Sequence, residues 1–289
     1  MEYRTLGRTG LKVSRLGFGG APIGLQGYLT PDDREDEAFC AGAVAALREA
    51  VERGINYFDT APGYGEGRSE RLMGEALAGV RERVVLATKY GFHPARSIGT
   101  YTDGLGASLE NLRTDHVDVL QLHGGYFDDE TADAVLDSGV LDWARQMQAR
   151  GLCRATGITA EGPSGGLERI LRSGAVDVLE IAYNVIYQGA CDYQRQPRGI
   201  IPLAKSMGLG VTTMRPTTCL VLQRLIATEL PEIDAGRLTR VAINFVLSTP
   251  EVDCVLVGMR TVDEVRANVQ LAEDSAARID LPALHRRYV

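Results

Sequence analysis

Three polar residues lie at the ends of apolar runs that are typical of buried β-strands. Asp59 lies near the end of INYFDT, Lys89 ends VVLATK and His123 ends VDVLQLH. Each has a plain explanation when taken singly: a carboxylate that caps a helix or loop, a lysine that reaches solvent, and a histidine hydrogen-bonded in the core. A buried charge is costly unless it is paired, so three such residues at equivalent strand ends indicate a shared site.

Tyr64 lies in the glycine-rich loop that follows Asp59. An ammonium beside a phenol lowers a pKa that starts near ~10, and an opposite charge typically contributes ~1–3 units. Lys89 would therefore favour the Tyr64 phenolate, and Asp59 would hold and balance Lys89. Asp59, Tyr64, Lys89 and His123 together predict a proton-transfer site centred on Tyr64.

The elements that must position these residues are alternating strands and helices. Amphipathic segments such as 37–53 and 238–248 separate the apolar runs, and Gly54, Gly151, Gly174 and Gly208 follow helical segments as C-caps do. We expect strands at 16–20, 55–60, 84–89, 117–123, 154–159, 178–184, 210–215 and 254–259. The pattern predicts an α/β fold, a single (β/α)8 TIM barrel over residues 1–289, in which residues at the carboxyl ends of the strands converge. Residues 3–14 are predicted to form an N-terminal β-hairpin that closes one end.

Composition narrows the class of partner. The net charge of −7 and the pI near 5.3 disfavour nucleic acid and anionic membranes. No apolar leader or long apolar run is evident, so we expect a cytoplasmic protein. The five cysteines form no CxxC pair and are expected to be buried free thiols, and the four histidines show no spacing typical of metal ligands, so no metal site is expected.

The four residues of the predicted proton-transfer site lie within motifs that resemble those of the aldo-keto reductases. FDTAPGYGEGRSERLMGEAL (58–77), TKYGF and LQLH are similar to the segments that carry that family's catalytic residues, and the likeness extends to VLVGMRTVDEVRANVQLA near the C-terminus. The resemblance implies that Asp59, Tyr64, Lys89 and His123 are catalytic. It also implies an extended cofactor, NADPH/NADP+ or alternatively NADH/NAD+, and a small carbonyl or sugar substrate. GFGGAP and GYGEGR break the GxGxxG pattern, in keeping with a cofactor bound without a Rossmann domain.

The cofactor positions implied by the resemblance include three departures. Thr159-Ala160 stands where the family has Ser-Asn, Glu180 where it has Gln, and Met214 where an aromatic residue stacks on the nicotinamide. Glu264 stands where some members have a basic residue and could bind a ribose hydroxyl instead, with Arg266 nearby. The adenosine end is expected at the start of the helix after the last strand, where free backbone N–H groups and Arg260 could bind phosphate and Asn268 the adenine. The predicted cofactor-binding residues are Gly20, Thr159, Glu180, Met214, Arg215, Gly258, Met259, Arg260, Glu264 and Asn268.

Substrate and direction are open at this point. Tyr28, Phe92 and Tyr126 are candidate substrate-binding residues, and LGFGGAPIG is similar to the bacterial aldose 1-dehydrogenase branch, which implies a sugar. The alternatives are a non-catalytic cofactor-sensing subunit, a metal-dependent barrel hydrolase and an esterase. The esterase would use the GxSxG match at 162–166, but the required Ser-acid-His order leaves only His285, near the C-terminus, to follow it. Oligomeric state and the choice between NADP and NAD are not determined by these patterns.

Overall fold

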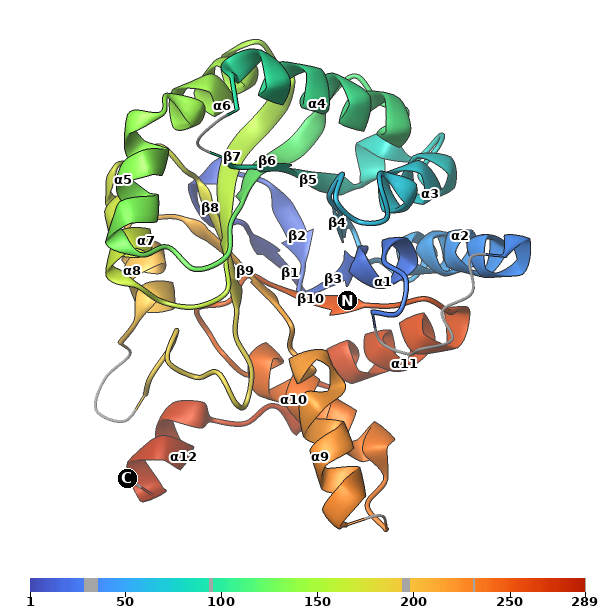
Figure 1. Cartoon of the computed structure of the whole chain (residues 1–289). Helices are drawn as coiled ribbons and strands as arrows, with labels where there is room; N and C mark the ends of the chain where they lie inside the picture. Colours follow the sequence, from blue (N-terminus) through green and yellow to red (C-terminus); the bar gives the residue numbers. More distant parts are fainter. Residues whose placement is uncertain (29–35, 94–95, 194–197, 231, 289) are drawn as a thin grey trace.

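Eight parallel strands close into a barrel in the computed structural model, which describes residues 1–28, 36–93, 96–193, 198–230 and 232–288 (Figure 1). The order around the barrel is β10-β3-β4-β5-β6-β7-β8-β9, so each strand pairs with its neighbours in sequence and the last pairs with the first. The bounds are β3 Leu16–Gly19, β4 Tyr57–Asp59, β5 Val85–Gly91, β6 Val117–His123, β7 Cys153–Ala160, β8 Val178–Ala182, β9 Gly210–Met214 and β10 Cys254–Gly258. The predicted fold class is confirmed, and the eight predicted strands are displaced only at their ends.

Helices surround the barrel, while α9 and α12 lie outside this ring at the lower edge of Figure 1. The predicted C-cap glycines Gly54, Gly151, Gly174 and Gly208 all have positive φ, which glycine adopts without the penalty that a Cβ imposes. The helices are α1 Ala21–Gly24, α2 Glu37–Glu52, α3 Arg68–Ala76, α4 Ile98–Leu112, α5 Asp129–Asp137, α6 Val140–Ala149, α7 Gly165–Arg172, α8 Ile200–Ser206, α9 Val221–Glu229, α10 Ala235–Leu247, α11 Val262–Glu273 and α12 Leu281–Tyr288.

The N-terminal hairpin closes the end of the barrel where the strands begin. Strands β1 (Tyr3–Thr5) and β2 (Lys12–Ser14) pair antiparallel, and Leu6, Leu11 and Val13 are buried in one apolar cluster with residues that the barrel strands contribute. These are Tyr57, Val85, Ala87, Val119, Ala155, Val178, Cys254 and Leu256. The predicted hairpin and its position as a plug are therefore confirmed.

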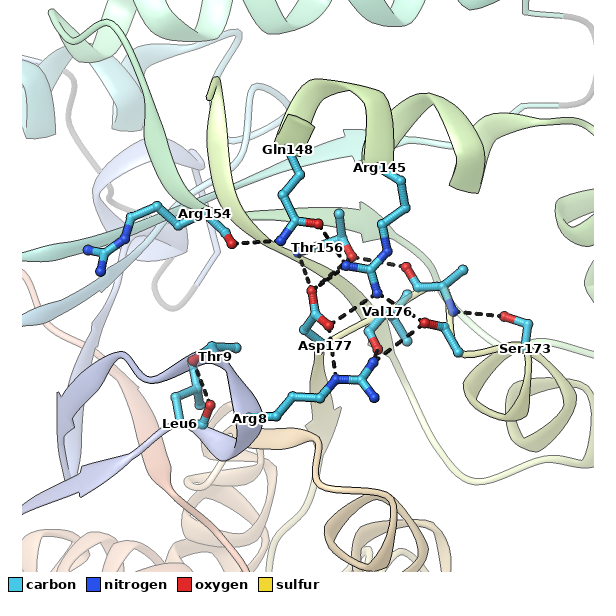
Figure 2. A network of polar contacts seen from close by, with 12 residues as sticks. Leu6, Arg8, Thr9, Arg145, Gln148, Arg154, Thr156, Ser173, Val176 and Asp177 are labelled. Atoms are coloured by element: carbon cyan, nitrogen blue, oxygen red, sulfur yellow. Dashed lines mark hydrogen bonds and ion pairs between the residues drawn. The ribbon is translucent and has the colours of Figure 1, made fainter. Parts of the chain in front are cut away.

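An ion-pair network ties the hairpin to the barrel (Figure 2). Asp177, just before β8, receives Arg8 Nε from the hairpin at 3.0 Å and Arg145 Nη1 from α6 at 2.6 Å. The same carboxylate accepts the backbone N–H of Thr156 on β7 at 3.2 Å. One side chain thus joins the hairpin, a helix and two strands.

The cysteines correct one expectation. All five are free, as predicted, but only Cys153, Cys191 and Cys254 are buried, whereas Cys40 and Cys219 are half-buried. Cys219 lies in the loop after β9 and lines the pocket described below. Among the helices of the described residues, none has the length and apolar character needed to cross a membrane.

Candidate active site

A buried ion pair lies inside the barrel, one layer above the apolar plug. Asp59 and Lys89 both point inward, because each lies two residues beyond an inward-facing member of the plug cluster on its strand, Tyr57 and Ala87. Lys89 Nζ lies 2.6 Å from Asp59 Oδ1 and also donates to the carbonyl of Thr60 at 3.0 Å. Their side chains are 1% and 5% exposed, so water screens this pair very little.

A second carboxylate shares the same lysine. Glu180 on β8 places Oε1 3.8 Å from Lys89 Nζ, and its side chain is 1% exposed. Gln121 on β6 donates its amide to Glu180 Oε2 at 2.9 Å and to Asp59 Oδ1 at 3.3 Å, and so bridges the two acids. Gly157 on the neighbouring strand makes room for it, since a Cβ there would lie 3.0 Å from Gln121 Cγ.

Tyr64 is held over this cluster by a tightly folded loop between β4 and α3. Its carbonyl accepts the N–H of Ser69, and its own N–H donates to Ala61. Gly24 allows this approach, because a Cβ there would lie 2.5 Å from the Tyr64 carbonyl oxygen. Lys89 Nζ lies 5.2 Å from the centroid of the Tyr64 ring, and the His123 ring meets Tyr64 edge-on with centroids 5.8 Å apart.

The four predicted catalytic residues therefore lie together, but the electrostatics of Tyr64 differ from the prediction. Burial raises the pKa of Tyr64 to about 12, because desolvation of the phenolate and the nearby carboxylates outweigh the opposing effect of Lys89. Burial, helped by Lys89, also lowers the pKa of His123 to about 4. Lys89 lowers the pKa of Tyr64, as expected, but burial raises that pKa by more. At neutral pH the site holds a protonated phenol beside a neutral imidazole.

The acids below Tyr64 are also perturbed. Burial raises the pKa of Asp59 well above its ordinary value, Glu180 adds to this rise, and Lys89 opposes it. Burial alone would lower the pKa of Lys89, but Asp59 and Glu180 outweigh it and hold that pKa above its usual value. Two carboxylates therefore compete for one ammonium.

A cavity of about 190 Å³ opens above this cluster at the carboxyl ends of the strands. Its wall includes the catalytic candidates Asp59, Tyr64 and His123. The predicted cofactor residues in the wall are Thr159, Glu180, Met214, Arg215 and Gly258, and the predicted substrate residue is Tyr28. The structure therefore brings residues from at least six strands or strand-end loops to one pocket.

Two contacts cross the mouth of this pocket. Arg215 Nη2 pairs with Glu161 Oε1 at 2.7 Å, and both side chains are well exposed. The Tyr28 hydroxyl lies 3.6 Å from Cys219 Sγ, in a segment where Thr218, Cys219 and Leu220 all have positive φ. Left-handed conformation is uncommon for residues with a Cβ, and it often marks a segment at a functional site.

The other predicted residues lie outside the pocket wall. Phe92 packs partly buried against the main core, and Tyr126 is 65% exposed. Met259 is fully buried, and Gly20 packs between β4 and α3, where a Cβ would lie 2.5 Å from Ser69 Oγ. Arg260, just before α11, and Asn268, in the middle of that helix, are half-buried, and their assignment to the adenosine end stays a prediction.

A capping box forms the start of α11. Thr261 and Glu264 form a reciprocal capping box: the Thr261 hydroxyl accepts the N–H of Glu264, and the Glu264 carboxylate accepts the N–H groups of Arg260 and Thr261. The capping box therefore engages the N–H groups of Arg260, Thr261 and Glu264, and the assignment of phosphate to this helix start stays a prediction. Arg266 Nε pairs with Glu49 at 2.8 Å.

Sequence reasoning missed Gln121 and Glu161. Gln121 precedes His123 by two residues on an apolar strand, and this spacing places both on the inner face, so the signal was available. The pairing of Glu161 with Arg215 carried no sequence signal, because 54 residues separate them. In the GxSxG segment, the Ser164 hydroxyl accepts the N–H of Leu167 as the N-cap of α7, so this serine has a structural role.

Comparisons with known proteins relate this chain to the aldo/keto reductases. The sequence model described as "Aldo/keto reductase family" matches residues 15–231. L-galactose dehydrogenase of Arabidopsis thaliana is 30% identical over 93% of this chain and 87% of its own length. The holo form of an aldo-keto reductase from Bacillus halodurans superposes with a TM-score of 0.75 at 26% identity, covering 99% of this chain and 94% of that one. An aldo/keto reductase of Klebsiella pneumoniae, solved with NADP and acetate, shares the fold, with a TM-score of 0.72 at 19% identity over 99% of this chain and 94% of that one.

Proposed function

This chain belongs to the aldo/keto reductase family, and from that premise we propose that it is an NAD(P)(H)-dependent oxidoreductase acting on a small carbonyl or alcohol substrate. The observation that carries the proposal is that Asp59, Tyr64 and His123 converge from separate strands and a loop on one cavity, with Lys89 paired to Asp59 beneath it. A protonated phenol, a buried ammonium and a neutral imidazole are the parts that proton transfer to a carbonyl oxygen requires.

The pocket is suited to a nicotinamide. Glu180 and Thr159 give the wall polar groups and Met214 an apolar one, and beneath the wall the buried Gln121 Oε1 has no hydrogen-bond partner in the described structure. Arg215 at the mouth supplies a positive charge that a pyrophosphate would need. We assign NADPH/NADP+ as the cofactor, and the Klebsiella pneumoniae protein of the same fold was solved with NADP. When bound, the nicotinamide supplies or accepts the hydride.

The residues of this chain then handle the proton. In reduction, the Tyr64 hydroxyl donates its proton to the substrate oxygen, which suits a phenol whose pKa burial raises to about 12. In oxidation, the same oxygen takes the proton of the alcohol. His123 is neutral because burial lowers its pKa to about 4. Its ring lies beside that of Tyr64 in the cavity wall, and it orients the substrate oxygen. Lys89 and Asp59 act from below as positioning residues.

Replacing Tyr64 with phenylalanine tests the assignment. We expect kcat with NADPH and a simple aldehyde to fall by about 10²–10⁴-fold, the usual contribution of a positioned acid–base group. The Kd for NADPH, measured by fluorescence titration, should change little. Tyr187→Phe is the matched control, because Tyr187 is 60% exposed and lies outside the pocket wall. Near-parental turnover by Tyr64→Phe would contradict the proton-transfer role.

Sugar oxidation is the second candidate. One relative that spans most of this chain is by name an L-galactose dehydrogenase, which favours a hexose or similar polyol as the substrate. Incubation with NAD(P)+ and a panel of free sugars would show absorbance from reduced cofactor at 340 nm if this candidate is right. A non-catalytic cofactor sensor would bind the cofactor but turn over neither the sugars nor a carbonyl panel.

A further inference from the structure

Because Glu180 is present, the floor of the pocket holds two carboxylates but one ammonium. Lys89 carries one positive charge, and it lies 2.6 Å from one oxygen of Asp59 and 3.8 Å from one oxygen of Glu180. Gln121 contributes hydrogen bonds to both acids but no charge. When all three ionisable side chains are charged, the cluster therefore has a net charge of −1.

The surroundings do not balance this charge. Lys89 and Glu180 side chains are each 1% exposed, so solvent screening is weak. At the pocket mouth, Arg215 is already paired with Glu161, and both side chains contact solvent. The other titratable groups that face the cluster are neutral acids or bases from β4, the β4–α3 loop, β6 and β10: Tyr57, Tyr64, His123 and Cys254.

The cluster has two ways to meet this imbalance. It can keep the negative charge, or the acid pair can hold one proton, as the rise in the pKa of Asp59 indicates. In the first case a cation in the pocket gains attraction directly. In the second, the cation takes the place of the proton. Both cases favour a positively charged group over a neutral one of the same shape.

Oxidised and reduced nicotinamide differ in this respect: the pyridinium ring is positive, and the dihydropyridine ring is neutral. We propose that Glu180 makes this pocket bind the oxidised cofactor more tightly than the reduced one, and that oxidised cofactor displaces a proton from the Asp59–Glu180 pair. The inference rests on the proposed function, because it requires nicotinamide in this pocket. A preference for oxidised cofactor favours oxidation of an alcohol, because the bound pyridinium ring can accept the hydride.

Binding measurements test this without catalysis. The full-length protein is titrated calorimetrically with NADP+ and with NADPH, each in two buffers of different ionisation enthalpy, so that proton release is counted. The parent should prefer NADP+ and release protons only with NADP+. Glu180→Gln keeps the shape but removes the charge. It should lower the preference for NADP+ by at least about tenfold, equivalent to about 1.4 kcal/mol, and abolish the proton release.

Two variants serve as controls. Glu180→Asp retains the carboxylate and should retain a preference for NADP+. Glu161→Gln makes the same chemical change at the exposed mouth, where solvent and Arg215 screen it, and should shift the preference less than twofold. The inference is overturned if Glu180→Gln binds both forms in the parental ratio, or if Glu161→Gln shifts that ratio as much. If the parent binds neither NADP(H) nor NAD(H), the proposed function itself is wrong.

Discussion

Replacing Lys89 with methionine should make the stability of the protein depend on pH in a defined way. The ammonium lies between Asp59 and Glu180, and its side chain is 1% exposed. Without it, the folded protein must bury one more unbalanced negative charge or bind one more proton. Binding the proton costs less in an interior that water does not reach.

The size of the effect follows from linkage. A carboxyl whose pKa is raised in the folded state contributes stability below its unfolded pKa of ~4 and loses it as pH rises through the folded pKa. Each extra proton held only by the folded state costs about 1.4 kcal/mol per pH unit in that range. The deficit of Lys89→Met relative to the parent should therefore grow by about 2.7 kcal/mol between pH 5 and pH 7.

Urea unfolding at pH 5, 6 and 7 measures this deficit. Combining Lys89→Met with Asp59→Asn should remove most of its pH dependence, because the second change deletes the acid that must bind the proton. Lys12→Met is the control: Lys12 is exposed and lies over the Tyr3 ring, 5.3 Å from its centroid. The same change there leaves no buried carboxylate unpaired, so the deficit should vary little with pH. A deficit for Lys89→Met that is constant from pH 5 to pH 7 would refute the reasoning.

Two further predictions concern the scaffold. Burial raises the pKa of Asp177, but Arg145, Thr156 and Arg8 lower it by more, so its stabilisation is present above the unfolded pKa of ~4 and is lost as pH falls through the folded pKa. Asp177→Asn should therefore cost about 1–3 kcal/mol at pH 7 and much less at pH 3, and an equal cost in urea unfolding at both values would contradict the network in Figure 2. Gly24→Ala places a methyl 2.5 Å from the Tyr64 carbonyl oxygen and should lower the free energy of unfolding by about 1–3 kcal/mol, and kcat with it. Gly42→Ala meets nothing within 4 Å and should be neutral or stabilising in the same two assays.

The strand pattern was readable because it is local. The apolar runs around Asp59, Lys89 and His123 have strand length, and glycines with positive φ end the helices between them. Parallel strands in a barrel bring their carboxyl ends to one face, so the shared site followed from this pattern without knowledge of any distance. Gln121 could have been added by the same reasoning, since it shares the inner face with His123.

The adenosine end was less readable because local hydrogen bonding competes with ligand binding. Glu264 was interpreted as a ribose ligand, but its carboxylate caps α11 together with Thr261. Phe92 and Tyr126 were chosen as loop aromatics, and a loop's path over the barrel determines whether such side chains reach the pocket. The assignment of these residues to ligands therefore needs the geometry of the loops.

By itself, the sequence determined the barrel, the hairpin and the identity of Tyr64 and the three groups around it, because apolar runs and the residues that end them are properties of each segment. Tertiary structure alone decided how those groups titrate. Closure of the barrel brings Glu180 on β8 within 3.8 Å of Lys89 on β5, and burial of Tyr64 outweighs the lysine that was expected to activate it. Both effects depend on distance across the barrel and on the exclusion of water, which no single segment specifies.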